Sequence, residues 1–571
     1  MVGATSEQDS LWLSTVLTSW QNILEARKPG ATIVPVIISS DRTQVTLFGS
    51  KTAYPVYLTI GNIPKDIRRK SSERSHILLA YLPTTKLQHI TSHASRRRMS
   101  QNLFHSCLHR ILEPLEFLGL EGIPMKDGNG TFRRTHPILA LFVADYPEQV
   151  LVTCVKTGNC PKCPAERDKL GDYSVSLDQR DFISIRATLS KGVNGDVRNY
   201  NAACARAGIK PVYHPFWFQL PYVDIFQSIS PDILHQLHQG VFKHLLKWLA
   251  AVYSPAELNA RYQRLIPNYH IRIFSNGITG LTRVTGKEHD QISRVLLGVI
   301  IDMRLCHGLD TSRLIRAVRA LLDFLYMAKL PVQTTQTLHR LNNALHNFHT
   351  NKSIFVDLGV RQHFNFPKLH SFLHYASSIN LFGTTDNYNT QHTERLHIDL
   401  TKKAYRSTNT KDEVAQMAQW LERQEKVFHH GEFIQRNVGL NVQSNSEVLP
   451  QLKPDRHVKM TSHPSEYSVA INNLVSDYGA IHFRDALARF AAGWLNPGFN
   501  HAQIEHASLN INIPFTTVSV YHRIKFINVG ETEVADALHV QPRRQNKKGQ
   551  YLPQRFDTAL VLVGGQGIHG M

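Results

Sequence analysis

The chain has 571 residues, of which 42% are hydrophobic and 19% are charged, a composition that describes a folded protein of several domains rather than a disordered one. No apolar run approaches the ~20 residues of a membrane-spanning helix, and the first residues lack the pattern of a secretory signal. Six cysteines scattered over this length argue against a disulfide framework and predict a reducing compartment.

The formal net charge of +19 predicts attraction to polyanions such as nucleic acids, because bound Lys and Arg release counterions from them. A solvated basic surface is the alternative. Local clusters favour phosphate contacts or a weak nuclear-import signal. These clusters are Arg68, Arg69, Lys70 and Arg74; Arg96, Arg97 and Arg98; Lys402 and Lys403; and Arg543, Arg544, Lys547 and Lys548.

Apolar runs and turn residues predict strands and helices along the first part of the chain. The predicted elements are a helix at 6–28, strands at 33–40, 54–60 and 76–82, a helix at 97–119 bent near Pro114, and a strand at 138–144. Three strands, a helix and a fourth strand beside the first are the core order of an RNase H-like fold, an α/β fold in which acids on the first and fourth strands are neighbours.

Two of these strands end at an aspartate: residues 33–41 read IVPVIISSD and residues 137–145 read PILALFVAD. Continuous apolar runs are typical of strands buried on both faces, where an ionised carboxylate is poorly tolerated. Asp41 and Asp145 therefore belong at the strand ends, where two acids would bind a hard divalent cation. Each aspartate alone is more often a turn or capping residue, so the pair carries the hypothesis.

Helical segments with loops are expected from about 146 to 380, with further helices over 389–428 and 466–495. The last portion, which includes FTTVSVYHRIKFINV and FDTALVLV, alternates like strands. The region 147–380 is too long for a connection within a compact domain and predicts an insertion. The expected division is an N-terminal helix at 1–32, the core at 33–146, the helical insertion at 147–380, the final core helix at 381–432, a linker at 433–465 and a small α+β module at 466–571.

Cys160 and Cys163 form a CxxC motif, whose spacing lets two thiolates bind one zinc ion. A redox role is the alternative. His370 and His374 are candidates for the other two ligands, because side chains at i and i+4 share a helix face. In a chain with 31 histidines, such a pair also arises as two ordinary helix residues.

A site for two cations needs a third carboxylate, and Glu394, Asp386 and Asp399 are candidates. Carboxylates held within a few ångströms repel one another until a cation binds. Bound Mg²⁺ or Mn²⁺ would remove that repulsion, activate a water or hydroxyl, and stabilise the leaving oxygen of a phosphoryl displacement.

Several long runs resemble the Plavaka transposases of mushroom-forming fungi, which belong to the CACTA (EnSpm) group of cut-and-paste DNA transposons. The runs are SSDRTQVTLF, YPVYLTIGNIPKDIRR, FVADYPEQ, CPKC, PDILHQLHQGVFKHLLKWL, KLHSFLHY and YNTQHTERLHIDLTKKAYRSTN. The resemblance implies a DDE transposase whose RNase H-like core is interrupted by a helical, zinc-binding insertion.

The resemblance also assigns roles to residues, in an order of acid, CxxC, paired histidines and glutamate that is similar to that of the V(D)J recombinase catalytic chain. The assigned residues are Asp41, Asp145 and Glu394 as catalytic acids that bind two Mg²⁺ or Mn²⁺ ions, and Cys160, Cys163, His370 and His374 as ligands of a structural zinc ion.

Asp232 and His235 resemble the DxxH signature of this group, and Asp232 competes with Asp145 for the role of second catalytic acid. Asp145 is preferred because a strand leads into it. PDILHQLHQGVFKHLL instead reads as the start of a helix, with Asp232 near the N-terminus, where a capping residue is expected.

The expected function is that of a transposase catalytic region acting in the nucleus on double-stranded DNA, at transposon ends and at a target. A homo-oligomer is expected by analogy, without membrane association. Compared with the family, the chain looks truncated at both ends. The alternatives are a catalytically inactive, transposon-derived DNA-binding or scaffold protein and, more weakly, a general nuclease.

Overall fold

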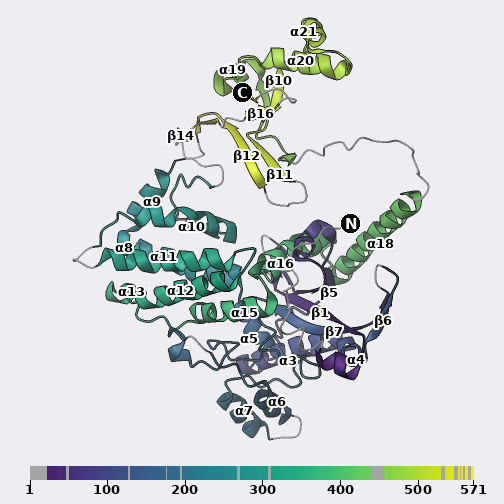
Figure 1. The fold of residues 1–571 in the computed structure, drawn as a ribbon, viewed down its shortest axis with the longest axis vertical. Coiled ribbons are helices and arrows are strands. Elements are labelled where there is room, and N and C mark those ends of the chain that lie inside the picture. The colour runs from purple at the N-terminus through teal and green to yellow at the C-terminus, as the bar shows by residue number, and fades with distance from the viewer. Residues whose placement is uncertain are drawn as a thin grey trace. The chain divides into compact units, whose positions relative to one another are not determined.

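The computed structural model of the chain describes residues 22–46, 51–126, 129–174, 177–192, 196–266, 271–305, 310–439, 456–461, 463–528 and 534–545, with short segments at 551–552, 554–556, 560–562 and 568–570. The chain divides into two compact units (Figure 1). The first comprises Met1–Arg264 and Phe274–Gln443, and the second comprises Leu265–Ile273 and Ser444–Met571. Among the described residues, no helix combines the length and apolar character needed to cross a bilayer.

The first unit contains a five-stranded mixed sheet with the strand order β5-β4-β1-β7-β6. Its strands are β1 (Ala31–Ser40), β4 (Pro55–Ile60), β5 (Ile77–Tyr81), β6 (Ile123–Lys126) and β7 (Phe132–Val143). β1 pairs parallel with β7 and antiparallel with β4, and the β4–β5 and β6–β7 pairs are antiparallel. The predicted α/β class is confirmed, and β6 is an edge strand that the apolar pattern did not predict.

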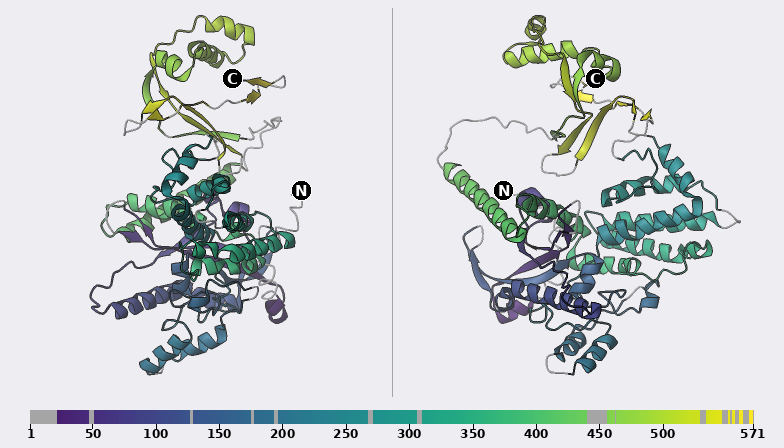
Figure 2. Two further views of the ribbon diagram at one scale, coloured as in Figure 1. Left: turned by 90° about the vertical axis from the view of Figure 1, so that its left-hand side faces the viewer. Right: turned by 180° about the vertical axis from the view of Figure 1, so that it is seen from behind.

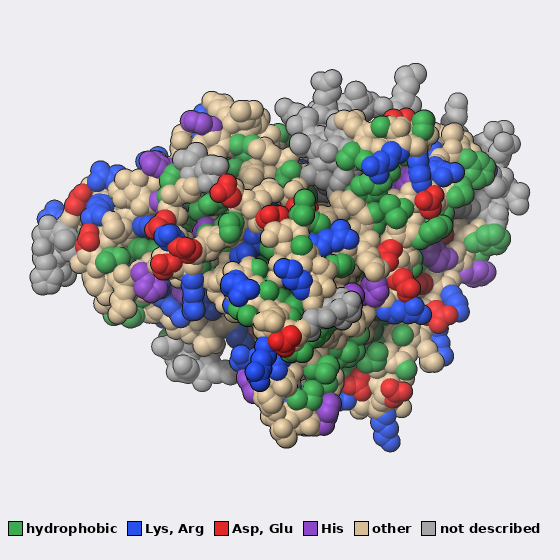
Figure 3. Space-filling model, turned by 90° about the horizontal axis from the view of Figure 1, so that it is seen from below, with side chains coloured by type: hydrophobic (Ala, Val, Ile, Leu, Met, Phe, Trp, Pro, Cys, Tyr) green, Lys and Arg blue, Asp and Glu red, His purple; other side chains and the backbone are tan. Residues whose placement is uncertain are grey.

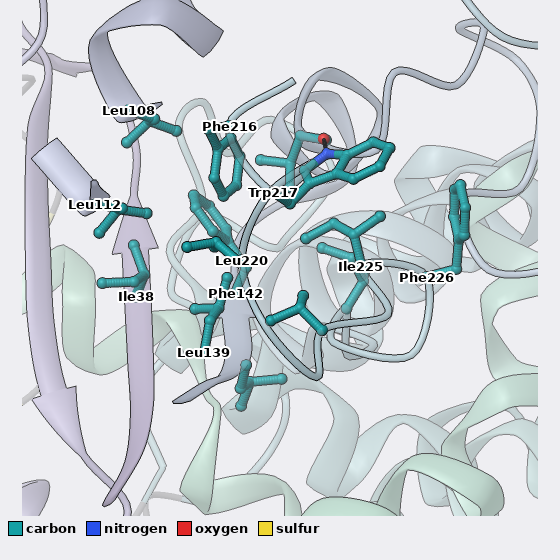
Figure 4. Close-up of a cluster of buried hydrophobic side chains, with 14 of the residues drawn as sticks. Ile38, Leu108, Leu112, Leu139, Phe142, Phe216, Trp217, Leu220, Ile225 and Phe226 are labelled. Carbon is teal, nitrogen blue, oxygen red and sulfur yellow. Dashed lines mark hydrogen bonds between the residues drawn. The ribbon is translucent and has the colours of Figure 1, made fainter. Parts of the chain in front are cut away.

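The hydrophobic core of the first unit forms where β1 and β7 meet helix α3 (His93–Leu112) and the segment 216–226 (Figure 4). Trp217 is fully buried and donates its indole N–H to the carbonyl oxygen of Val152 at 2.8 Å, so its one polar group is satisfied. Other side chains of this core are Ile38, Leu108, Leu112, Leu139, Phe142, Phe216, Leu220, Ile225 and Phe226.

Helices make up most of the first unit beyond β7, as its two further views show (Figure 2). Helix α4 (Pro114–Glu121) begins directly after α3, so the single helix predicted over 97–119, bent near Pro114, is two helices that meet at that proline. The later elements are α5 (Tyr146–Val152), α6 (Phe182–Ser190), α7 (Val197–Arg206), the π-helix η4 (Ile233–Phe242), α8 (Lys243–Tyr253), α9 (Pro255–Gln263), α10 (Gly286–Ile300), α11 (Thr311–Ala328), α12 (Thr335–Asn351), α13 (Ile354–Asp357), α14 (Pro367–His370), η6 (Ser371–His374), α15 (Tyr375–Phe382), α16 (Thr390–Leu396), the π-helix η8 (His397–Lys402), α17 (Lys403–Arg406) and α18 (Glu413–Gly439).

The second unit contains both strands and helices in its described part. Its principal strands are β8 (Arg456–Met460), β9 (Glu466–Ala470), β10 (Thr517–Val520), β11 (Arg523–Asn528), β12 (Val534–Gln541) and β15 (Arg555–Phe556). They form a four-stranded sheet of order β15-β12-β11-β8 and the pair β10-β9. Its helices are α19 (Ile471–Tyr478), α20 (Phe483–Leu495) and α21 (His501–Ser508).

Two predicted helices are wrong in part. The helix expected over 389–428 is interrupted between α17 and α18, where Thr410 and Asp412 have left-handed backbone (φ 64° and 46°). The polar run STNT at 407–410 favours a turn, because its side chains compete for backbone hydrogen bonds. The helix expected over 466–495 begins with strand β9, whose pairing with β10 outweighs local helix preference.

Two further predictions meet the limits of the described residues. Of the expected N-terminal helix, residues 22–27 are helical and 6–21 lie outside the described part. Of the expected linker, residues 440–455 lie outside it, while α18 extends to Gly439 and β8 begins at Arg456. The two ends of the expected linker therefore have regular structure.

Candidate active site and metal centre

The two predicted acids at strand ends, Asp41 and Asp145, follow matching positions of neighbouring strands. β1 and β7 are parallel, and their register pairs Ser39 with Val143, two residues before each aspartate. Because the two strands are parallel neighbours about 4.8 Å apart, both acids leave the sheet at the same end of the strands. Asp145 also caps helix α5, and its Oδ1 accepts a hydrogen bond from the Glu148 N–H at 3.0 Å.

A third acid reaches this edge because the segment before η4 runs beside the end of β7. Ile229 forms a parallel bridge with Phe142, and the Phe142 N–H donates to the carbonyl oxygen of Ser228 at 2.8 Å. The Gln149 side chain donates to the carbonyl oxygens of Ala144 and Ser230, at 2.7 and 2.8 Å. These bonds hold the chain that leads into Asp232 next to the chain that leads into Asp145.

Asp232 is buried at the N-terminus of η4, where its carboxylate accepts hydrogen bonds from the backbone N–H groups of Leu234 and His235 at 3.3 and 2.7 Å. The capping role predicted for Asp232 is therefore present. Its oxygens also lie 2.7 Å from His235 Nδ1 and accept a hydrogen bond from the Thr390 hydroxyl at 2.7 Å. The aspartate thus joins η4 to the first residue of α16.

His235 connects Asp232 to Glu394. The Nε2 atom of its ring lies 3.2 Å from Glu394 Oε1. Burial lowers the pKa of His235, but hydrogen bonds to Asp232 and Glu394 outweigh burial and raise the pKa to about 10. His235 is therefore a cation at neutral pH, held between two carboxylates. Gly240 permits the close backbone packing within η4, because a Cβ there would lie 2.7 Å from the carbonyl oxygen of His235.

The charges around Asp145 act on one another. Burial raises the pKa of Asp145, and the carboxylates of Asp41 and Asp232 raise it further, against the Glu148 N–H and the His235 cation. Mutual repulsion of this kind is what a bound cation relieves. The residues of this acidic site are Asp41, Asp145, Asp232, His235 and Glu394.

The acidic site is open rather than closed around an ion. Within the described ranges, Cys160, Cys163, His370 and His374 are the one group of three or more Asp, Glu, His or Cys residues whose ligand atoms all lie within 4.8 Å of one another. Asp41, Asp145 and Glu394 do not meet that distance. The Glu394 carboxylate is directed to His235, and its side chain is 43% exposed.

The other two candidates for the third acid are held by basic side chains. Asp386 lies 3.5 Å from Lys65 Nζ and 3.7 Å from an Arg69 nitrogen. Asp399 lies 2.7 Å from Lys403 Nζ. Of the three candidates, Glu394 is the one in contact with the chain of groups that includes Asp232 and His235.

Two residues at the acidic site were missed from the sequence. Glu148 is buried and accepts hydrogen bonds from the hydroxyls of Ser40 and Tyr54. Burial raises the pKa of Glu148, to about 8. His397 lies 3.5 Å from Asp41 Oδ2 and 3.0 Å from the Tyr57 hydroxyl. Glu148 lies three residues after Asp145, and His397 lies three residues after Glu394. Side chains three residues apart share a helix face, so this spacing was the available signal.

The four predicted zinc ligands lie together in the protein interior. Cys160 Sγ lies 3.2 Å from His374 Nε2, and Cys163 Sγ lies 3.0 Å from His370 Nε2. All four residues are buried. A tetrahedral zinc ion with Zn–S of ~2.3 Å and Zn–N of ~2.1 Å separates its ligand atoms by about 3.4–3.8 Å, so these residues fit one. The cluster could hold zinc.

Charged side chains fix the CxxC loop to the rest of the unit. Lys162, between the two cysteines, is buried and donates to the carbonyl oxygens of Gln227 and Ile229. Burial lowers the pKa of Lys162 to about 8. Arg180 donates to the carbonyl oxygen of Cys160 through two nitrogens, at 3.0 and 2.9 Å. Lys162 therefore connects the Cys/His cluster to the segment that leads into Asp232.

The described residues thus combine two acids that follow parallel strands with a buried Cys2His2 cluster that could hold zinc. The sequence model of the Plavaka transposase family matches residues 6–249, and this similarity indicates a transposase. The match includes Asp41 and Asp145 but ends before His370 and Glu394. No curated protein matches the chain.

Proposed function

We propose that this chain is the catalytic region of a DDE-type DNA transposase, with an RNase H-like core interrupted by a helical insertion. The strand order β5-β4-β1-β7-β6, in which β1 and β7 are parallel neighbours, supports this fold. The match to the Plavaka transposase family over residues 6–249 supports the function. Membership of the CACTA group and an origin in mushroom-forming fungi are part of the proposal.

One observation carries the catalytic assignment: Asp41 and Asp145 follow paired positions of two parallel strands, and the charge of Asp41 acts on Asp145. With Glu394, they would hold two Mg²⁺ or Mn²⁺ ions, since carboxylate oxygens are the ligands that these cations prefer. The ions would supply activation of water or a 3′-hydroxyl and stabilisation of the leaving oxygen. We propose Asp145 as the second acid and Asp232 as the residue that orients His235.

The protein groups of the site prepare these acids for their role. The Glu148 N–H orients Asp145, and His235 holds the partly exposed carboxylate of Glu394 near the two strand ends. For all three acids to share cations, Glu394 must turn from His235 towards the aspartates. His235 would keep its bond to Asp232, which favours the charged ring, and would then face the phosphate and stabilise the negative charge that develops there.

The Cys160, Cys163, His370 and His374 cluster would bind a structural zinc ion. Its ligands come from the loop after α5 and from α14 and η6, so bound zinc would join two distant parts of the chain. The substrates would be double-stranded DNA at transposon ends and at a target. The protein would act in the nucleus. It would act there as a homo-oligomer, because a transposase brings two DNA ends together.

The test is nicking of supercoiled plasmid with Mn²⁺ or Mg²⁺. We expect metal-dependent nicking by the unaltered chain, and its loss in Asp41→Ala and Asp145→Ala. Asp399→Ala is the matched control, since that acid is paired with Lys403 outside the acidic site. Nicking that survives both aspartate substitutions would refute the assignment. Strand-joined products with a second DNA distinguish a transposase from a general nuclease.

A catalytically inactive, DNA-binding or scaffold protein is the second candidate. The observation in its favour is that Asp145 and Asp232 both cap helices, and that the three proposed acids do not lie within 4.8 Å of one another among the described residues. DNA binding that persists while no nicking occurs with either metal would select this candidate.

A further inference from the structure

A groove in the first unit gathers eight Lys and Arg side chains among its lining residues. Its volume is about 1440 Å³, and its lining comes from the end of β1, the loop after β5, the first turns of α3, and the residues around 156 and 210. The cations that matter here are Arg42, Lys86, Arg97, Arg98, Lys156 and Lys210. Glu413 is the one acid among its lining residues.

The groove holds more positive charge than its own acid can balance. Glu413 pairs with Lys51 at 2.8 Å. Among the described residues, no carboxylate forms an ion pair with Arg42, Arg97 or Lys210. Burial lowers the pKa of Lys210, and the charge of Arg97 lowers it further. Like charges that lie together without a carboxylate are stabilised when an anion binds between them.

Two lining residues of the groove adjoin elements that carry the acidic site. Arg42, in its lining, directly follows Asp41 in the chain. The Arg42 guanidinium lies 5.2 Å from the centre of the Tyr54 ring, and the Tyr54 hydroxyl donates to Glu148 at 2.6 Å. Leu151, on the helix capped by Asp145, also lines the groove. A polyanion in the groove would therefore extend to the carboxylates at the strand ends.

We propose that this groove binds the phosphate backbone of duplex DNA next to the phosphodiester that is cut. This inference rests on the proposed function and names the surface that the function needs. Flexible Lys and Arg side chains without a carboxylate partner suit phosphates, whose contacts position DNA without reading its sequence. The first turn of α3, at His93 and Ala94, adds backbone N–H groups that favour an anion. Lys and Arg side chains are spread over the face seen from below, so the test needs a control set of cations outside the groove (Figure 3).

The test compares two triple variants with the same loss of charge. Lys86→Ala, Arg97→Ala and Lys210→Ala remove groove cations, whereas Lys287→Ala, Arg319→Ala and Arg340→Ala remove exposed cations of α10, α11 and α12. Binding of a fluorescent 30-base-pair duplex is measured by anisotropy across a salt series, without Mg²⁺ or Mn²⁺. We expect the groove variant to bind about 100-fold more weakly near 150 mM salt, with a salt slope smaller by about 2 to 3, and the control to change about twofold.

Equal weakening by both triple variants, or none by the groove variant, would overturn the proposal. Tighter binding of a duplex RNA of the same sequence would overturn DNA as the ligand. If the triple groove variant does not fold, Lys86→Gln and Arg97→Gln test the exposed cations singly, each with a slope smaller by about 0.9. Nicking is scored separately. DNA binding that depends on the groove, without nicking, would refute the proposed catalysis and support the groove as the binding site. Nicking together with DNA binding that does not depend on the groove would support the catalysis and refute the groove.

Discussion

The Nε2 atom of His235 lies 3.2 Å from the Oε1 atom of Glu394. This contact joins the π-helix η4 to helix α16, two elements far apart in the sequence. Element η4 is not a regular helix, since Gly240 within it has non-helical backbone angles (φ −102°, ψ −106°). The contact is what places a third acid near the strand ends that carry the first two.

Replacing Glu394 with Gln keeps the side chain's size but removes the charge that would bind a cation. We expect nicking and strand joining to fall about 100-fold or more, because losing a metal ligand removes several kcal/mol of transition-state stabilisation. Asp399→Asn, on the next turn, is the control and should stay near the rate of the unaltered chain. Initial rates on supercoiled plasmid at saturating Mn²⁺ measure both, and equal rates for the two variants would contradict the role of Glu394.

Replacing His235 with Ala leaves the buried Asp232 without its cationic partner. We expect the free energy of unfolding to fall by about 2–3 kcal/mol, since Asp232 keeps its bonds to Thr390 and the backbone. Glu394→Gln should cost less than about 1 kcal/mol, because that side chain is 43% exposed and water screens its charge. Urea unfolding measures both free energies. A larger loss of stability in Glu394→Gln than in His235→Ala would show that the contact between His235 and Asp232 is not the main stabilising contact.

Removing zinc should destabilise the first unit. We expect one zinc ion per chain by elemental analysis, none in Cys160→Ser, and a fall in Tm of about 10 °C or more for that variant or after chelation with 1,10-phenanthroline. Cys107→Ser is the control, because Cys107 is a free thiol of α3 outside the cluster. A metal-free protein with the same Tm before and after the chelator would exclude a structural zinc ion.

Acid should unfold the protein partly through His105. Burial lowers the pKa of His105 to about 3, so the folded chain keeps it neutral while the unfolded chain, with an ordinary pKa near 6.5, takes up a proton. The stability due to the neutral ring is present above pH 6.5 and is lost as the pH falls towards 3, at about 1.4 kcal/mol per pH unit.

His105→Met should make the loss of stability between pH 6 and pH 4 less steep by about that amount, as measured by urea unfolding at each pH. An unchanged slope in His105→Met would mean that other histidines carry the acid sensitivity.

The apolar runs predicted the central sheet because burial on both faces leaves an unmistakable pattern. Strands β1 and β7 appear in the sequence as IVPVIISS and PILALFV, and each run ends at the aspartate that the structure places at the sheet edge. A bend at Pro114 was predictable from local sequence, since proline disrupts a helix interior, and in the structure one helix ends there and the next begins. The turn at 407–412 was not predicted, although its polar residues were the available signal.

Local sequence thus determined which segments form buried strands, where two acids leave them, and which cysteines and histidines have the spacing of metal ligands. Only the tertiary structure decided that Cys160, Cys163, His370 and His374 share one cluster, that Asp232 reaches β7 through Ile229, and that Glu394 faces His235. The reason is physical: strand and helix preferences arise between residues a few positions apart. Contacts between distant residues depend on the packing of whole elements, which no local pattern encodes.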